Sequence, residues 1–250
     1  MSGHSKWHSI KHKKGALDAQ RGKIFTRHAK LIAIAARNGG DVDSNPSLRA
    51  AIDNAKADNV PNMNIDRAVK KGSGQGKDAV AYEEIFYEGF GPRGIAVYIH
   101  AITDNRNRAS SELKTVLSRH GGGMGATGSS SWIFDKKGLI TIPLANVSDL
   151  DELEMKIIDA GADDIKKEND YLDVYTNFAS FAQVRANLLK MGVKIESGEI
   201  TYIPKQTVKI TDEDEARKVL NMIESLEEND DVNDVFANFD IDDEIIEKLA

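Results

Sequence analysis

The fold is decided by one stretch in the second half of the chain, GLITIPLANVSDLDELEMKIIDAGADDIKKENDYLDVYTNFASFAQVRANLLKMGVKIESGEITYIP (138–204). Apolar alternation and helical spacing within it predict six elements in the order strand, helix, strand, strand, helix, strand. We expect strands over 139–142, 164–167, 171–175 and 199–203, and helices over 150–160 and 181–191. This βαββαβ order is that of a ferredoxin-like domain.

The segments on either side of this stretch are interpreted as two halves of one further domain. Before it, strands over 82–88 and 95–102 form a hairpin, and a helix over 107–120, a glycine-rich segment and a short strand at 133–134 follow. After it come a strand over 207–210, a helix over 213–226, a strand over 232–238 and a terminal helix. A hairpin with one helix lacks the strands of a stable sheet. We therefore expect a discontinuous α/β domain (79–134 and 205–250), with a ferredoxin-like domain (135–204) inserted in it.

The N-terminal part of the chain, residues 1–78, is predicted to be a helical domain. A first helix runs from about residue 16 to the glycine pair 39–40, and a second begins at Pro46 behind the candidate caps Ser44 and Asn45. A third, short helix ends before Gly72. Short loops and facing apolar stripes predict a three-helix bundle. GSGQGKD (72–78) is interpreted as a linker, and the chain as a whole as α+β.

The net charge of the chain changes sign close to the end of this predicted helical domain. Residues 1–77 hold 15 Lys and Arg against six Asp and no Glu, a net charge of +9, whereas the remainder sums to −16. Such asymmetry indicates a nucleic-acid-binding module joined to an acidic body.

The candidate phosphate contacts lie in the basic arm and first helix, where helical spacing places Lys23, Arg27 and Lys30 on one face. The full set in this part is Lys6, Lys11, Lys13, Lys14, Arg21, Lys23, Arg27 and Lys30. A second contact is suggested by Arg106 and Arg108 at the start of a helix, where cations oppose the helix dipole. That arrangement fits an anion site, and it fits pairing with the acidic body equally well.

Other motifs give no support for an enzyme or a cofactor. His4, His8 and His12 recur every fourth residue, but neighbouring lysines would repel a metal ion, so phosphate contact is favoured. The glycines of 72–77 do not form a nucleotide-binding loop, because Lys77 is followed by Asp78. GGGMG (121–125) follows a helix rather than a strand, which excludes the dinucleotide fingerprint and indicates a mobile loop or a close backbone approach. The motifs GxSxG and HExxH do not occur.

The composition also favours a cytoplasmic location. There is no cysteine, no apolar run near the roughly 18 residues of a membrane span, and no apolar segment of a secretory signal near the start.

Several stretches together resemble one known family. They are GHSKWHSIKHKK (3–14), RGKIFTRHAKLIAIAAR with the following glycine pair (21–40), NPSLRAAIDNAKADNVP (45–61), YEGFGPRGIAVYI (87–99), TDNRNRASSEL (103–113) and FDKKG (134–138). The chain is identified by them as similar to the YebC family, whose mitochondrial relative is the translational activator of cytochrome c oxidase. The resemblance implies one helical and two α/β domains, no enzyme activity, and a bacterial cytoplasmic protein. Members of the family are usually described as DNA-binding transcriptional regulators, and others act in translation on messenger RNA or at the ribosome.

These observations predict a non-enzymatic regulator of gene expression that binds nucleic acid, with a DNA-binding transcriptional regulator as the first interpretation. The alternative is a translation factor that binds messenger RNA or the ribosome. The acidic domains are expected to face protein partners, such as basic ribosomal proteins. A purely protein-binding adaptor would leave the +9 segment unexplained.

Overall fold

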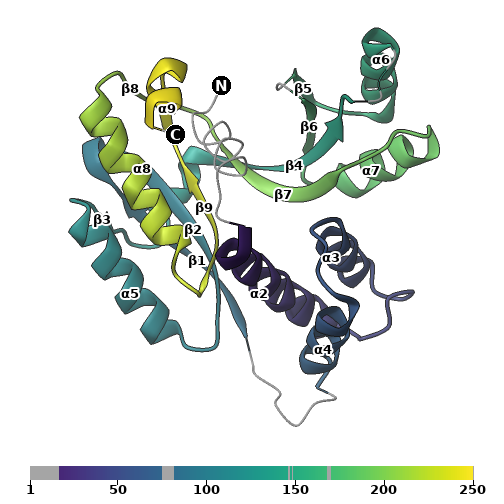
Figure 1. Cartoon of the computed structure of the whole chain (residues 1–250), viewed down its shortest axis with the longest axis horizontal. Helices are drawn as coiled ribbons and strands as arrows, with labels where there is room; N and C mark the ends of the chain where they lie inside the picture. The colour runs from purple at the N-terminus through teal and green to yellow at the C-terminus, as the bar shows by residue number, and fades with distance from the viewer. Residues whose placement is uncertain (1–16, 75–81, 146, 148, 168–169, 250) are drawn as a thin grey trace. The chain divides into compact units, whose positions relative to one another are not determined.

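The computed structural model describes residues 17–74, 82–145, 147, 149–167 and 170–249, and it confirms the α+β class (Figure 1). It divides into two compact units, one built from residues 1–134 and 204–250 and the other from 135–203. Within the first unit, the separation of a helical domain ending at residue 78 from an α/β domain stays a prediction.

The helical part of the first unit is a bundle of α2 (Leu17–Ala36), α3 (Pro46–Ala57) and α4 (Asn62–Gly72). Asn45 fixes how α3 begins, because its side-chain oxygen accepts the N–H of Leu48 at 3.0 Å. The Asn45 amide also donates to the carbonyls of Ala35 and Gly39, each at 2.8 Å. One side chain therefore caps α3 and holds it against the end of α2. The bundle core is formed by Ile32, Ala36, Leu48, Ile52, Ala55, Val60, Ile65 and Ala68.

The end of α4 packs directly on the α2 backbone. A Cβ added to Gly72 would lie 2.1 Å from the Ala33 carbonyl oxygen and 2.6 Å from the Ala33 Cα. Only glycine permits this approach, so Gly72 belongs to the packing of the bundle rather than to a linker.

The α/β part of the first unit contains a sheet in the order β3-β1-β2-β9. Its strands are β1 (Glu83–Phe90), β2 (Ala96–Thr103), β3 (Gly123–Met124) and β9 (Val232–Ala237). The helices α5 (Arg106–Arg119) and α8 (Glu213–Glu227) cover one face of this sheet (Figure 1). The late strand β9 pairs with β2, so the two halves of the chain share one core.

The strand expected over 232–238 is present as β9, which ends at Ala237, and a short strand that the sequence did not predict follows after Asn238. Asn238 accepts the Ala96 N–H on its side-chain oxygen at 2.8 Å and donates to the Gln206 carbonyl at 3.2 Å. These bonds lead the chain out of the first sheet, and β10 (Phe239–Ile241) pairs in parallel with β8 (Val208–Ile210). The terminal helix α9 (Asp243–Leu249) follows.

The second unit has the ferredoxin-like arrangement expected from its sequence, with sheet order β5-β6-β4-β7. Its elements are β4 (Phe134–Pro143), α6 (Leu150–Ala160), β5 (Asp164–Lys167), β6 (Tyr171–Asn177), α7 (Phe181–Lys190) and β7 (Ser197–Pro204). Phe134 and the strand expected at 139–142 belong to the one continuous strand β4, in which Lys137 already pairs with Asn177, whereas Ile133 lies in the 3-10 turn before it. Both helices pack on one face, around Ile140, Ile157, Leu172, Val184 and Leu188.

A buried carboxylate holds the glycine-rich segment after α5. Glu88 accepts backbone N–H groups of Gly128 at 2.7 Å, Ser130 at 2.6 Å and Ser131 at 2.8 Å. Burial alone would raise the pKa of Glu88, but these bonds outweigh it and hold the pKa below its ordinary value. The close backbone approach expected for this segment is present, since a Cβ on Gly122 would lie 2.2 Å from the Phe90 carbonyl oxygen.

Candidate nucleic-acid interface

The basic face of α2 is the part of the candidate interface that the structure describes. Lys23, Arg27 and Lys30 are spaced by four and three residues, so a helix places them in one row. The opposite stripe of α2 enters the bundle core through Ile32 and Ala36. The amphipathic pattern therefore fixes the direction in which the three cations point.

An acidic edge of the α/β part lies against this row. It is formed by the turn before β9 and the first residues of β9, and we call the segment 228–234 the acidic edge. The pairing of β2 with β9 shifts here, since His100 pairs with Asp234 while Ala101 pairs with Val232. The shift leaves Asn233 as an extra residue, a bulge that bends the strand and redirects its side chains.

Lys30 is held by two oxygen atoms of this edge and by one carbonyl of the neighbouring strand β2. Its Nζ donates to the carbonyls of Ile102 at 3.0 Å and Asp230 at 2.5 Å, and lies 3.4 Å from Asp231 Oδ1. The Lys30 and Asp231 side chains are only 11% and 6% exposed. A lysine ammonium has three N–H donors, so all three are engaged inside the molecule.

The other two cations of the row also contact the acidic edge. Arg27 forms an ion pair with Asp234, and Lys23 Nζ donates to the Glu228 carbonyl at 3.4 Å. Asp234 is shared with β2, because its second oxygen lies 3.3 Å from His100 Nδ1. His100 in turn bonds Glu84 at 2.8 Å and stacks on the Phe86 ring.

Arg108 reaches the same edge from the start of α5. Its guanidinium contacts both oxygens of Asp231, the shortest distance being 2.8 Å, and Asp104 at 2.8 Å. Burial would raise the pKa of Asp231, but hydrogen bonds from Arg108 and Thr103 and the charges of Lys30 and Arg108 hold it below its ordinary value. The hydrogen bonds to Asp231 and Asp104 raise the pKa of Arg108. Asp231 is thus a carboxylate shared by two cations.

Arg106 is placed differently from Arg108. Its side chain is 67% exposed, and its Nε lies 3.8 Å from Glu83. The pairing with acids that the sequence left open for these two arginines is therefore present, tightly at Arg108 and loosely at Arg106.

The remaining predicted residues lie where no side chain is described. Lys6, Lys11, Lys13 and Lys14, with His4, His8 and His12, fall outside the described residues. Arg21 belongs to α2, but its side chain is not among the described ones. In the part of the chain that the structure describes, no three His, Asp or Glu side chains gather in a way that suits a metal ion.

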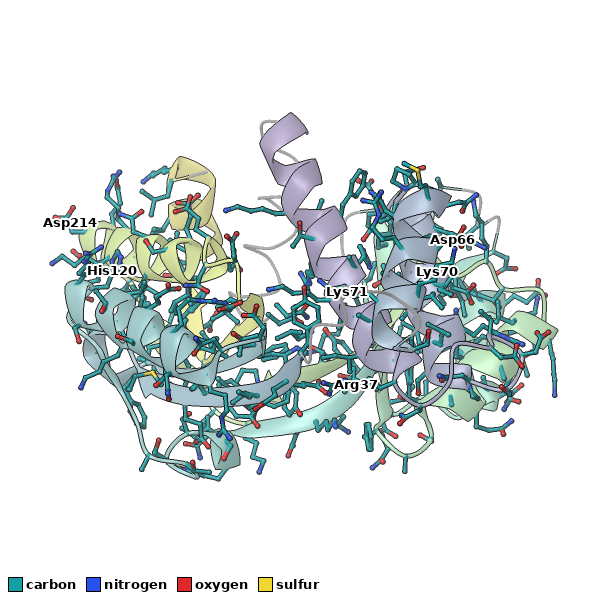
Figure 2. All side chains as sticks on the ribbon, turned by 90° about the horizontal axis from the view of Figure 1, so that it is seen from below. Arg37, Asp66, Lys70, Lys71, His120 and Asp214 are labelled. Atoms are coloured by element: carbon teal, nitrogen blue, oxygen red, sulfur yellow. The ribbon has the colours of Figure 1, made fainter. Side chains whose placement is uncertain are left out.

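Sequence reasoning did not include the cations of α4. Lys71 donates to the Tyr82 hydroxyl at 3.0 Å, and its ammonium lies 4.8 Å from the centre of the Tyr82 ring. In Figure 2, Lys71 lies beside α2, and Lys70 and Asp66 lie farther from it. Lys70 and Lys71 stand in the last turn of α4, where cations are expected from the helix dipole alone, so the sequence does not distinguish Lys71 as a contact of Tyr82.

Sequence reasoning also missed the acidic edge itself. Asp231 and Asp234 stand in a chain segment rich in acids, and no local pattern distinguishes them from solvated neighbours. Lys30 and Asp231 are 201 residues apart, so only the fold brings them together.

Comparison with known proteins agrees with this architecture. A family model described as the TACO1/YebC protein N-terminal domain matches residues 5–75, and one described as the TACO1/YebC second and third domain matches residues 82–239. The chain belongs to the TACO1/YebC family. The resemblance noted in the sequence is thereby confirmed.

Relatives of the TACO1/YebC family match over the full chain. A protein of Syntrophobacter fumaroxidans is 50% identical over 251 residues, covering 100% of both chains, and is named "Probable transcriptional regulatory protein". A protein of Thermotoga petrophila with the same name is 46% identical, covering 100% of this chain and 98% of its own. The crystal structure of a conserved hypothetical protein from Aquifex aeolicus superposes with a TM-score of 0.85 at 45% identity, covering 94% of this chain and 96% of that one.

The described helices give no membrane-spanning candidate, since none of them combines the length and the apolar character that a crossing requires.

Proposed function

We propose that this chain is a non-enzymatic regulator of gene expression that binds nucleic acid, in the first place duplex DNA, through its basic arm and first helix. The residues assigned to phosphate contact are Lys6, Lys11, Lys13, Lys14, Arg21, Lys23, Arg27 and Lys30, with Arg106 and Arg108 as a second contact. The names of the relatives support a role in transcription.

The observation that carries the proposal is the segregation of charge. The first 16 residues hold four lysines and three histidines and no acid, and they lead directly into the basic row of α2. A cation-rich segment joined to an acidic body concentrates its attraction for a polyanion at one end of the chain. The acidic body itself repels phosphate and leaves protein partners as its expected contacts.

RNA is the alternative ligand, in the role of a translation factor that binds messenger RNA or the ribosome. The ferredoxin-like unit is a four-stranded sheet with two helices on one face, an architecture in which aromatic side chains of an RNA-binding sheet stack on bases. On the central strand β6 Tyr171 is exposed, but Tyr175 is buried and Asp173 stands between them, which weakens the case for base stacking and phosphate attraction on this face. RNA is therefore tested beside DNA rather than preferred.

The test is a fluorescence-anisotropy titration of labelled random duplex DNA and single-stranded RNA across a series of salt concentrations. Each phosphate contact contributes a slope of about −0.9 in log K against log salt on duplex DNA, and about −0.7 on single strands. Replacing Lys13→Glu and Lys14→Glu is expected to weaken binding and to reduce the slope on duplex DNA by about two such contacts.

The matched control is Lys190→Glu with Lys194→Glu, which makes the same change in net charge at exposed positions of the ferredoxin-like unit. If both double variants weaken binding equally, the arm has no special role. If the wild-type protein binds neither polymer, or binds without salt dependence, the proposal is wrong. Tighter binding to RNA at equal salt would favour the translational alternative.

A further inference from the structure

The contact between α2 and the acidic edge has a consequence for how nucleic acid could bind. We propose that residues 228–234 act as an internal competitor for phosphate, so that the protein has a closed form in which the α2 cations are occupied and an open form in which they are available. This inference rests on the proposed function, since it concerns the regulation of the same basic face.

The closed contact leaves no free donor on Lys30. Its ammonium reaches two backbone carbonyls and one carboxylate oxygen, and its side chain is 11% exposed. A phosphate has to replace these oxygens rather than add to them. Lys30 therefore contributes to binding only after the contact has opened.

The acidic edge presents an oxygen acceptor to each of the three cations of the row. Along α2, Lys23 meets the Glu228 carbonyl, Arg27 meets the Asp234 carboxylate, and Lys30 meets the Asp230 carbonyl and the Asp231 carboxylate. Carboxylates and carbonyls are the acceptors that compete with phosphate for lysine and arginine.

The contact is suited to opening because it is polar. In the described residues, the buried apolar cluster of the bundle and that of the α/β part have no residue in common. Separation of the two parts at this contact breaks ion pairs and hydrogen bonds that water or phosphate can replace, and it leaves both apolar clusters intact.

The perturbation with the least structural risk is Asp234→Asn. The Asp234 side chain is 25% exposed and the Arg27 side chain 38%, so this pair is more accessible than the one between Lys30 and Asp231. The asparagine keeps the shape and a carbonyl oxygen, but it removes the charge that holds Arg27. Asp214→Asn is the matched control, since it makes the same charge change at an exposed position of α8 (Figure 2).

Binding of labelled random duplex DNA and single-stranded RNA is measured at low salt for the full-length wild-type chain and both variants. We expect Asp234→Asn to bind about fivefold tighter than Asp214→Asn, which corresponds to the release of one accessible ion pair. Equal affinities for the two variants would overturn the proposal while leaving nucleic-acid binding in place. If no protein binds either probe, the proposed function fails, and the inference fails with it.

A second measurement does not depend on the folding of that variant. The chain has no cysteine, so Met63→Cys on α4 and Ser118→Cys on α5 provide unique exposed sites for two nitroxide labels. Double electron–electron resonance should report one short distance for the free protein and a longer or broader distribution when the probe is added. Binding of the probe with an unchanged distance distribution would mean that the contact stays closed, and would refute the competitor role.

Discussion

The carboxylate of Glu88 gives the sharpest test of how the fold of the α/β part is held. Replacing Glu88→Gln keeps the shape of the side chain but puts an amide NH2 in place of one oxygen. The Ser130 and Ser131 N–H groups share Oε2, whereas the Gly128 N–H donates to Oε1. A glutamine oxygen can serve the first two, and its NH2 then faces the Gly128 N–H, donor against donor.

The magnitude follows from these three bonds. One donor left without an acceptor costs about 1–3 kcal/mol, and weakening two charge-assisted bonds to neutral ones adds about 1 kcal/mol. We therefore expect Glu88→Gln to lower the free energy of unfolding by about 3 kcal/mol at pH 7. Glu196→Gln, at an exposed position of the ferredoxin-like unit, is the matched control and should change little.

The pH dependence has a definite sign. The pKa of Glu88 is lowered from 4.5 in the folded protein, so its ionised form stabilises the fold fully above 4.5. That stabilisation is lost as the pH falls through the folded pKa. The difference in stability between the wild-type chain and Glu88→Gln should be constant between pH 7 and about 5.5, and it should narrow below 4.5.

The assay is urea denaturation followed by tryptophan fluorescence in a Trp7→Phe background. Trp132 is then the only tryptophan, and its Nε1–H donates to the Ser129 carbonyl at 3.1 Å, inside the segment that Glu88 holds. The reasoning is refuted if Glu88→Gln and Glu196→Gln have the same free energy of unfolding at pH 7. It is also refuted if the difference in stability between the wild-type chain and Glu88→Gln stays unchanged below pH 4.5.

Two further stability predictions concern the helical bundle and are measured by thermal denaturation with circular dichroism. Gly72→Ala should destabilise the protein by about 2 kcal/mol or more, because the new Cβ meets the Ala33 backbone. Its control, Gly22→Ala, should stabilise the protein by about 1 kcal/mol, because the new Cβ has nothing within 4 Å. Equal effects of the two substitutions would contradict the packing described. Asn45→Ala should cost about 2–3 kcal/mol, the sum of a lost helix cap and two carbonyls left without a donor. Ser44→Ala, the other residue that the sequence offered as a cap, should cost less than about 0.5 kcal/mol, and the reverse order would show that the cap is assigned wrongly.

The sequence predicts best those elements whose start and end signals both stand next to them in the chain. The helix at 150–160 begins behind Asp149, whose side chain accepts the Glu152 N–H at 3.0 Å, and ends at Gly161 with a left-handed backbone. Both signals stand in the sequence next to the residues that they control. Predicted and observed bounds agree there for that reason.

The elements that the sequence misses depend on distant partners. The strand Gly123–Met124 has two residues and exists only because it pairs with Gly89 and Phe90. The break at Asn238 is caused by bonds to Ala96 and Gln206, of which Ala96 is 142 residues away. Local periodicity carries no information about either contact.

The candidate site shows the same division between local pattern and distant partner. Helical spacing was sufficient to place Lys23, Arg27 and Lys30 in a row, and the structure has that row. It was not sufficient to show that Glu228, Asp231 and Asp234 lie opposite, since these residues are about 200 positions away in the chain. The direction in which the three cations point could be predicted from the sequence. That they are already paired with acceptors of the same molecule could not.

The two electrostatic contacts of α2 are coupled through salt. Added salt weakens the binding of phosphate, and it also weakens the closed contact with the acidic edge. The observed affinity is the affinity of the open form multiplied by its population, and that population rises with salt. The slope of log K against log salt is therefore shallower than the number of phosphate contacts implies, most of all at low salt where the closed form prevails.

Asp234→Asn removes part of the closed contact, so it should steepen the slope at low salt while it raises the affinity. A basic face with no internal competitor would show no such change of slope, because a tighter variant without a new phosphate contact keeps the slope of the wild-type protein.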